Sequence, residues 1–293
     1  MMDANARALP DQWQHRTAER SWTGTLDGKP LEKTTATRAR GPHWLHVLRV
    51  LTWHDYHSRY RAQALGVVWS LLNPLVMMAI LSLIFSRVFH SAVDNFPIFM
   101  LIGTIVWQWV SSATSAATNG FVHNAEIVKR TVFPRQLLPV SMVLSYAINF
   151  GMESLLLFIF IPIFPSAFKL SPALLLIPVL IFALALLLTG IALMVSVLNV
   201  LYRDVAYLVQ TGLMLLYWLT PVIYPYEVVP EPYQTVLKCS PLGAILSALR
   251  NAVMHGTVPS ALGWASIWAP TLLLLGAGWL VFRHYERLVL DYV

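Results

Sequence analysis

One carboxylate, Glu153, lies inside a long apolar stretch of the sequence. A carboxylate in the middle of a membrane helix costs about 2.5 kcal/mol or more on insertion scales, so it needs a polar partner or water. Ser141, Ser145 and Asn149 precede Glu153 at intervals of four residues, with Tyr146 beside them. Because residues four apart share one face of a helix, this spacing predicts a helix with one polar side. The chemistry open to such a side is hydrogen bonding to a polar ligand.

Two other apolar stretches carry polar and aromatic side chains at similar helical spacing. One holds Thr104, Trp107, Gln108, Ser111 or Ser112, Ser115 and Asn119; the other holds Tyr207, Gln210, Met214, Tyr217 and Trp218. For any single residue, helix packing or an interfacial belt is the better explanation. The three faces together favour a sugar-like ligand, whose C–H face stacks on rings while its hydroxyls bind amides. The predicted substrate channel is lined by Trp107, Ser111, Tyr146, Asn149, Glu153, Gln210, Tyr217 and Trp218.

The sequence carries no motif of covalent catalysis or nucleotide binding. It has no GxxxxGK[ST] phosphate loop, no HExxH, no GxSxG and no clustered histidines. Its single cysteine, Cys239, excludes an intramolecular disulfide. We therefore expect no catalytic residue, no metal site and no cofactor in this chain, so the energy for uphill transport must come from another protein.

Composition indicates the class of protein that positions these side chains. Of 293 residues, 57% are hydrophobic and only 12% are charged, and the mean hydropathy is +0.62. Apolar stretches of about 20 residues, the length that crosses a bilayer core, recur along the chain. We predict an all-α polytopic membrane protein with six transmembrane helices, at about 67–87, 97–118, 136–164, 173–199, 205–224 and 264–282.

The net charge of +6 is explained by membrane orientation better than by nucleic-acid binding. Lys and Arg are concentrated before the first predicted span, in the 119–135 loop, in the 200–204 turn and at the C-terminal end. Loops rich in these residues stay on the cytoplasmic side. Both termini are therefore expected in the cytoplasm.

Segments outside the spans have distinct characters. Residues 1–42 are polar and lack an apolar period, which predicts a flexible cytoplasmic tail. Residues 43–66 combine basic and aromatic side chains at helical spacing, which predicts an amphipathic interface helix, and 67–293 form the six-span transport domain. In the external loop 224–263, Leu242, Leu246 and Leu249 share one helical face opposite Arg250. This pattern predicts short helices that dip into the outer leaflet or cap an exit.

The stretch from Asn124 to Pro134 is a charged island between two apolar runs. Asn124 suits an N-cap, Glu126 lies in the first turn, and Lys129 and Arg130 lie near the other end, an order that favours a helix. Pro134 limits this helix to about two turns. Because two turns are not stable alone, we expect the helix to pack on a soluble partner protein.

Several ordered motifs extend over about residues 45 to 285. They are Arg59-Tyr60-Arg61, Leu65-Gly66, Trp69, Leu72-Asn73-Pro74-Leu75, Gly103 with Trp107, the 124–134 segment, Asn199-Val-Leu-Tyr-Arg-Asp204 and Thr220-Pro-Val-Ile-Tyr-Pro225. In these motifs and their order, the chain resembles the membrane subunits of type-2 ABC exporters for O-antigen polysaccharides and teichoic acids.

The resemblance implies a homodimeric permease in the bacterial inner membrane, with two copies of a separate cytoplasmic ABC ATPase that binds ATP and magnesium. The implied cargo is a lipid-linked glycan such as O-antigen, teichoic acid or a capsule-like polymer. The implied roles are coupling to the ATPase for Glu126, Ile127, Val128, Lys129, Arg130, Asp55 and Arg59, and an external gate for Tyr224, Leu242, Leu246 and Leu249.

Two alternatives remain at this point. The same scaffold could export a drug or a small lipid, although a hydrophobic drug would not require the amides. The chain could also be a membrane-embedded glycan-modifying enzyme that uses Glu153.

Overall fold

The computed structural model describes residues 43–61, 68–87, 95–131, 133–230, 234, 237 and 240–289, so the predicted tail of residues 1–42 lies outside the described residues. All regular structure in these ranges is helical. The longer helices are α1 (His43–Tyr60), α2 (Val68–Arg87), α3 (Phe96–His123), α5 (Leu137–Phe160), α6 (Ile177–Leu201), α7 (Val205–Leu219), α9 (Pro241–Arg250) and α10 (Ala261–Tyr285). The shorter elements are α4 (Ala125–Arg130), the 3-10 turns η2 (Pro165–Ala167), η3 (Pro172–Leu176) and η4 (Tyr226–Val228), and the π-helical turn η5 (Asn251–His255).

Within the described part of the chain, four helical segments are long and apolar enough to cross a membrane. They are Phe96–His123, Leu137–Phe160, Pro172–Leu201 and Ala261–Tyr285. The apolar part of α2, Val68–Ile84, and the whole of α7 are shorter. Each of the six predicted spans thus contains a helix, but α7 rises only about 22 Å, against a hydrocarbon core of about 30 Å.

Two helices end earlier than the sequence predicted, because of prolines. Helix α5 ends at Phe160 rather than near residue 164, since Pro162 and Pro165 lack the N–H groups that would continue the hydrogen-bond ladder. Helix α7 ends at Leu219 rather than at residue 224, and Thr220 is extended, with φ −86° and ψ 139°. The following Pro221 disfavours the helical conformation at Thr220.

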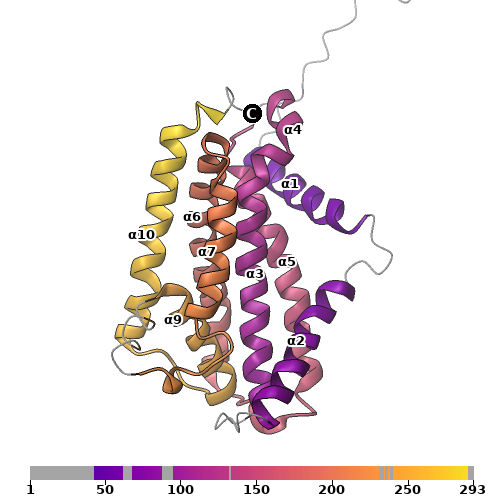
Figure 1. Cartoon of the computed structure of the whole chain (residues 1–293), viewed down its shortest axis with the longest axis vertical. Coiled ribbons are helices and arrows are strands. Elements are labelled where there is room, and N and C mark those ends of the chain that lie inside the picture. The colour runs from indigo at the N-terminus through magenta and orange to yellow at the C-terminus, as the bar shows by residue number, and fades with distance from the viewer. Residues whose placement is uncertain are drawn as a thin grey trace, which may run out of the picture. The chain divides into compact units, whose positions relative to one another are not determined.

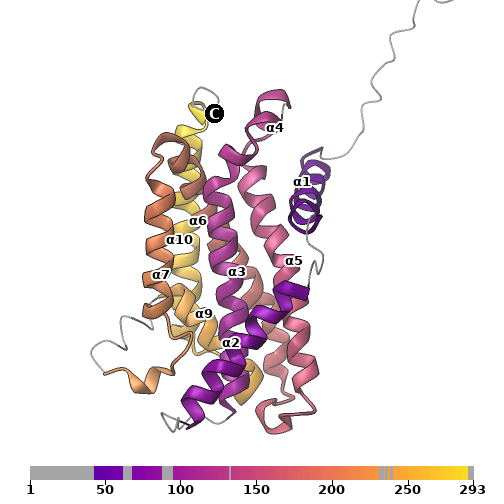
Figure 2. The ribbon, with the colours of Figure 1, turned by 45° about the vertical axis from the view of Figure 1, so that its right-hand side comes forward.

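Helix α3 lies at the centre of residues 42–293, which form one compact unit. It contacts α2, α5, α6, α7 and α9, and 72% of its most apolar stretch is buried within the protein (Figure 1). Helix α2 crosses α3 at an angle and also reaches α5 (Figure 2). Helix α1 lies against α5, at the end of the helices that also carries α4. The polar faces predicted on α3, α5 and α7 therefore do not meet in one space. Some lie on one side of the place where α2 crosses α3, and some lie on the other.

The opposite side of α3 is built around a close crossing of α6 and α10. A Cβ atom on Gly190 would lie 2.7 Å from the carbonyl oxygen of Leu274, and a Cβ on Gly278 would meet the carbonyl of Gly190. Only glycine permits backbones to approach this closely, and such small-residue contacts are a common way to pack membrane helices. The contact between α6 and α10 therefore holds together the side of the protein that lies away from the polar faces.

Candidate functional site

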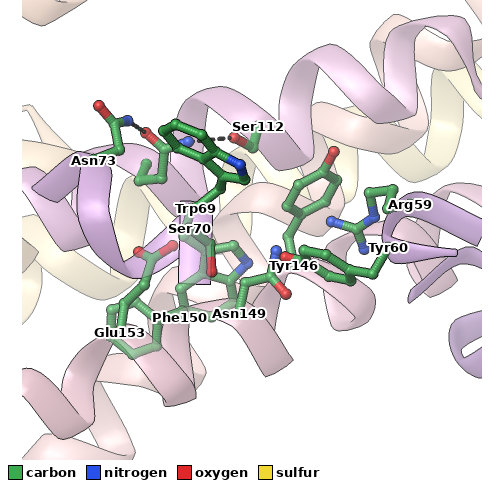
Figure 3. Close-up of a pocket in the computed structure, with 12 residues that line it drawn as sticks. Arg59, Tyr60, Trp69, Ser70, Asn73, Ser112, Tyr146, Asn149, Phe150 and Glu153 are labelled. Carbon is green, nitrogen blue, oxygen red and sulfur yellow. Dashed lines mark hydrogen bonds between the residues drawn. The ribbon is translucent and has the colours of Figure 1, made fainter. Parts of the chain in front are cut away.

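A polar cavity of about 330 Å³ lies between α1, α2, α3 and α5. Its lining residues are Arg59, Tyr60, Trp69, Ser70, Asn73, Gln108, Trp109, Ser112, Tyr146, Asn149, Phe150 and Glu153. Figure 3 shows Arg59, Tyr60 and Tyr146 at one end, Glu153 at the other, and Asn149 between them. We name it the α5 cavity. Three predicted channel residues, Tyr146, Asn149 and Glu153, therefore face one common space, as their helical spacing indicated.

Helix α1 reaches this cavity through Arg59. Its Nη2 donates to Asp55 Oδ2 at 3.0 Å and also to Ser145 Oγ. The guanidinium carbon lies 3.6 Å from the centroid of the Tyr146 ring, a cation–π contact. Residues Asp55 and Arg59, which the family resemblance assigns to ATPase coupling, thus form an ion pair joined to α5, and their coupling role stays a prediction.

A second cavity of about 330 Å³ lies between α2, α3 and α7, and we name it the α7 cavity. Its lining residues are Asn73, Pro74, Met77, Thr104, Trp107, Gln108, Ser111, Leu213, Met214 and Tyr217. The Trp107 and Tyr217 rings pack with centroids 5.2 Å apart at 55°. Three more predicted channel residues, Trp107, Ser111 and Tyr217, are brought together here.

A short chain of side-chain hydrogen bonds lies where the two cavities adjoin, and Asn73, at one end of this chain, is exposed. Asn73 Nδ2 donates to Gln108 Oε1 at 3.3 Å, and Gln108 Nε2 donates to Ser112 Oγ at 3.1 Å. Asn73 and Gln108 line both cavities. The place where α2 crosses α3 is therefore bridged by amides rather than by apolar contacts alone.

Two predicted channel residues do not line either cavity. Gln210 is exposed on α7, and Trp218 is 58% exposed, with its ring 5.6 Å from that of Tyr217. Their assignment to a channel stays a prediction. Conversely, Tyr60, Trp69, Asn73 and Phe150 were not predicted as lining residues. Asn73 was detectable from the sequence, because an amide within an apolar helix needs a polar partner, as the carboxylate of Glu153 does.

The predicted two-turn helix is present as α4, next to the C-terminal end of α3. Val128 is buried, whereas Glu126, Lys129 and Arg130 are exposed. The predicted side-chain cap by Asn124 is wrong, since Asn124 Nδ2 donates to the Gly120 carbonyl instead, at 2.9 Å. Thus α4 is anchored by one buried apolar residue and presents its charges to solvent, and its role in coupling stays a prediction.

Helix α9 confirms the apolar face predicted in the external loop, because Leu242, Leu246 and Leu249 are all buried. The placement of Arg250 opposite that face was wrong, since its side chain is buried as well. The sequence also predicts a short helix in this loop that includes Tyr233, Val236 and Leu237, and of these three only Leu237 is among the described residues. The gate role of these leucines stays a prediction.

The guanidinium of Arg250 donates hydrogen bonds to backbone carbonyls from two segments that are distant in the sequence. Nε donates to the Phe99 oxygen at 3.2 Å, Nη1 to the Pro221 oxygen at 2.5 Å and Nη2 to the Val222 oxygen at 2.6 Å. The guanidinium carbon also lies 3.5 Å from the Phe99 ring centroid. Burial lowers the pKa of Arg250 to about 9, so the guanidinium stays a cation at neutral pH. We name these contacts the Arg250 cluster.

Tyr224, the fourth predicted gate residue, lies just beyond this cluster. Its hydroxyl donates to the carbonyl oxygen of Trp218 at 2.9 Å and to that of Leu219 at 3.3 Å. Tyr224 therefore satisfies carbonyl groups at the end of α7, where no helical N–H follows.

The chain is similar to known proteins over the helices that line both cavities. A family model described as ABC-2 type transporter matches residues 46–254. The chain is 31% identical to an O-antigen export system permease protein RfbA from Klebsiella pneumoniae, over 72% of this chain and 82% of that protein. It is 25% identical to an RfbA protein from Myxococcus xanthus, over 81% and 91% of the two chains. It is also 25% identical to the polysialic acid transport protein KpsM from Escherichia coli, over 83% and 95%. The matched region includes both cavities, α4 and the Arg250 cluster, and this chain belongs to the ABC-2 type transporter family.

Proposed function

We propose that this chain is the permease subunit of an ATP-driven exporter that carries a lipid-linked polysaccharide across the bacterial inner membrane. The observation that carries the proposal is the pair of cavities in an ABC-2 type chain, each lined by aromatic rings together with amides or hydroxyls. Rings stack on the C–H face of a sugar and amides bind its hydroxyls, so this lining suits a glycan better than an apolar drug. The relatives named for O-antigen export and polysialic acid transport support the same cargo class.

The proposed permease is a homodimer with six membrane spans and both termini in the cytoplasm. Helices α2 and α7 are the two short apolar helices, and they flank the α7 cavity together with α3. Large side chains on α7 are exposed, among them Tyr207, Met214 and Trp218. A second copy packed on this side would cover those side chains and enclose the cavity, so the substrate path would lie between two copies.

The energy is supplied by two copies of a separate cytoplasmic ABC ATPase, which binds ATP and magnesium and docks on α4 and α1. Glu126, Lys129 and Arg130 offer charges of both signs to that partner. When the ATPase closes, it displaces α4, whose buried Val128 passes the movement to the helix ends. Arg59 gives a second connection, because it joins α1 to the wall of the α5 cavity.

The test is a charge reversal on α4 in the source bacterium. The variant Glu126→Lys with Lys129→Glu should abolish surface polysaccharide and co-purification of the ATPase, while the amount of permease in the membrane is unchanged. The matched control is Lys169→Glu, which reverses an exposed charge between α5 and α6, at the other end of the helices. Normal surface polysaccharide in a strain that lacks this chain would contradict the proposed cargo. Normal ATPase binding by the reversed variant would contradict the proposed docking.

A further inference from the structure

Another cavity, which the proposed function does not use, lies at the end of the helices that carries α4. It has about 360 Å³ and lies between the C-terminal ends of α3 and α6 and the N-terminal end of α7. Its lining residues are Asn119, Val122, Ala125, Asn199, Val200, Arg203 and Ala206, and none of these seven is aromatic. Ala125 is the first residue of α4. We name this space the Arg203 cavity.

Asn199 is the buried polar residue of the Arg203 cavity. It is 5% exposed, and its Oδ1 has no hydrogen-bond partner within the described part of the chain. A buried polar atom without a partner costs free energy and is therefore rare in folded proteins. An apolar side chain at this place on α6 would avoid that cost. The amide therefore indicates a polar ligand in the cavity that Asn199 lines.

The other polar groups around the cavity are hydrogen-bond donors. Arg203 is exposed, and it forms no ion pair with any residue that the structure describes. Ala206 lies in the first turn of α7, where backbone N–H groups have no partner within the helix. Asn119 donates one N–H to the Ser115 carbonyl at 3.3 Å and keeps a second. An arginine beside a helix N-terminus favours a phosphate, and the exposed carboxylate of Asp204 does not line the cavity.

The Arg203 cavity lies at the depth of lipid headgroups. Helix α6 has 25 residues and rises about 37 Å, which is longer than a hydrocarbon core of about 30 Å. Asn199 is in the last turn of α6, so it lies near the border of the hydrocarbon core. Tyr202, just beyond the helix, is 66% exposed, and exposed tyrosines are typical of this level of the membrane. Basic pockets between the ends of membrane helices bind phospholipid headgroups in other proteins.

We propose that the Arg203 cavity binds the phosphodiester headgroup of a membrane phospholipid. The phosphate accepts hydrogen bonds from Arg203 and from the N–H of Ala206, and a headgroup hydroxyl or ammonium donates to Asn199 Oδ1. A bound headgroup would also contact Ala125, at the start of α4. This inference goes beyond the proposed function, because it requires neither a polysaccharide cargo nor an ATPase.

The test is native mass spectrometry of the full chain, purified and delipidated in detergent. The probe is phosphatidylglycerol with two oleoyl chains, and diacylglycerol with the same chains is the matched ligand without phosphate. The unmodified chain should bind phosphatidylglycerol at least about tenfold more tightly than diacylglycerol, because the phosphate adds hydrogen bonds between charged groups.

Three variants locate the binding in the Arg203 cavity. Arg203→Gln removes the charge, Ala206→Leu fills the space with a good helix former, and Asn199→Asp places a carboxylate of similar shape near the phosphate. Each should lower the affinity for phosphatidylglycerol at least about tenfold. Arg283→Gln is the matched control, since Arg283 is an exposed arginine at the same end of the helices and lines none of the three cavities (Figure 1). If Asn199→Asp does not fold, the two variants at exposed or half-buried positions still decide the test.

The outcomes separate the source of the phosphate from the site itself. Unchanged affinity in Arg203→Gln and Ala206→Leu would overturn the site. Phosphatidylglycerol should resist a tenfold excess of farnesyl diphosphate or inorganic phosphate. Displacement by farnesyl diphosphate would overturn the assignment to a membrane phospholipid in favour of a lipid diphosphate, and displacement by inorganic phosphate would overturn it in favour of a free anion. Normal surface polysaccharide in a strain that lacks this chain would refute the proposed cargo without affecting these measurements, which use lipid alone.

Discussion

Replacing Arg250 with Met gives the sharpest test of how the end of the protein that carries α9 is held together. The change removes three charge-assisted hydrogen bonds, to the carbonyls of Phe99, Pro221 and Val222, while keeping a side chain of similar length. Each buried carbonyl left without a donor costs roughly 1–3 kcal/mol, so we expect a loss of at least about 3 kcal/mol of stability. The stability of Arg250→Lys should lie between that of Arg250→Met and that of the unmodified protein. The ammonium group keeps the positive charge, but it cannot match the forked geometry of the guanidinium donors.

The measurement is the midpoint of thermal unfolding of the purified permease in detergent, followed by size-exclusion chromatography after heating. Arg250→Met should lower the midpoint by several degrees, and Arg250→Lys should lower it less. Gly103→Ala tests the same packing, since a Cβ there would meet the Arg250 guanidinium and would lie 2.6 Å from the Val222 oxygen. Gly103→Ala should lower the unfolding midpoint less in the Arg250→Met background than in the unmodified chain, as expected for two residues in contact. An Arg250→Met midpoint within error of the unmodified protein would show that these carbonyls find other partners, and would refute the reasoning.

Three further predictions concern other parts of the fold. Arg59→Leu should release α1 from α5 and so increase proteolysis within residues 43–61, measured by limited trypsin digestion of membranes, with Arg61→Gln as a control for the loss of a cleavage site. Gly278→Leu should prevent folding, because its side chain would meet the Gly190 carbonyl; protein that accumulates and elutes like the unmodified permease would count against the close crossing. Glu126→Gln should change the unfolding midpoint very little, because its 3.8 Å ion pair with Arg130 is mostly exposed and such pairs contribute about 0–1 kcal/mol; a loss of several degrees would mean that α4 depends on this pair.

The helices themselves follow from the sequence, because long apolar runs have few alternatives in a membrane. Helix ends were less predictable. The α5 and α7 segments stay apolar past Phe160 and Leu219, and only the prolines that follow stop the helices. Counting apolar residues therefore overestimated both lengths.

The candidate site was predictable to the extent that it lies on single helices. Tyr146, Asn149 and Glu153 share a face of α5, and the structure places them in one cavity. Contacts between helices were not predictable in this way. Arg250 follows a helical pattern that puts it opposite the leucines, and only the carbonyls of Phe99 and Pro221, far away in the sequence, explain its burial.

The glycine contact between α6 and α10 has a practical consequence for spectroscopy. Because the two backbones touch at Gly190 and Gly278 with no side chain between them, we expect α6 and α10 to move as one unit. A pair of spin labels, one on the exposed surface of each helix, should give one narrow distance distribution with or without nucleotide. That pair would then serve as an internal ruler, against which displacements of the rest of the permease during turnover can be measured.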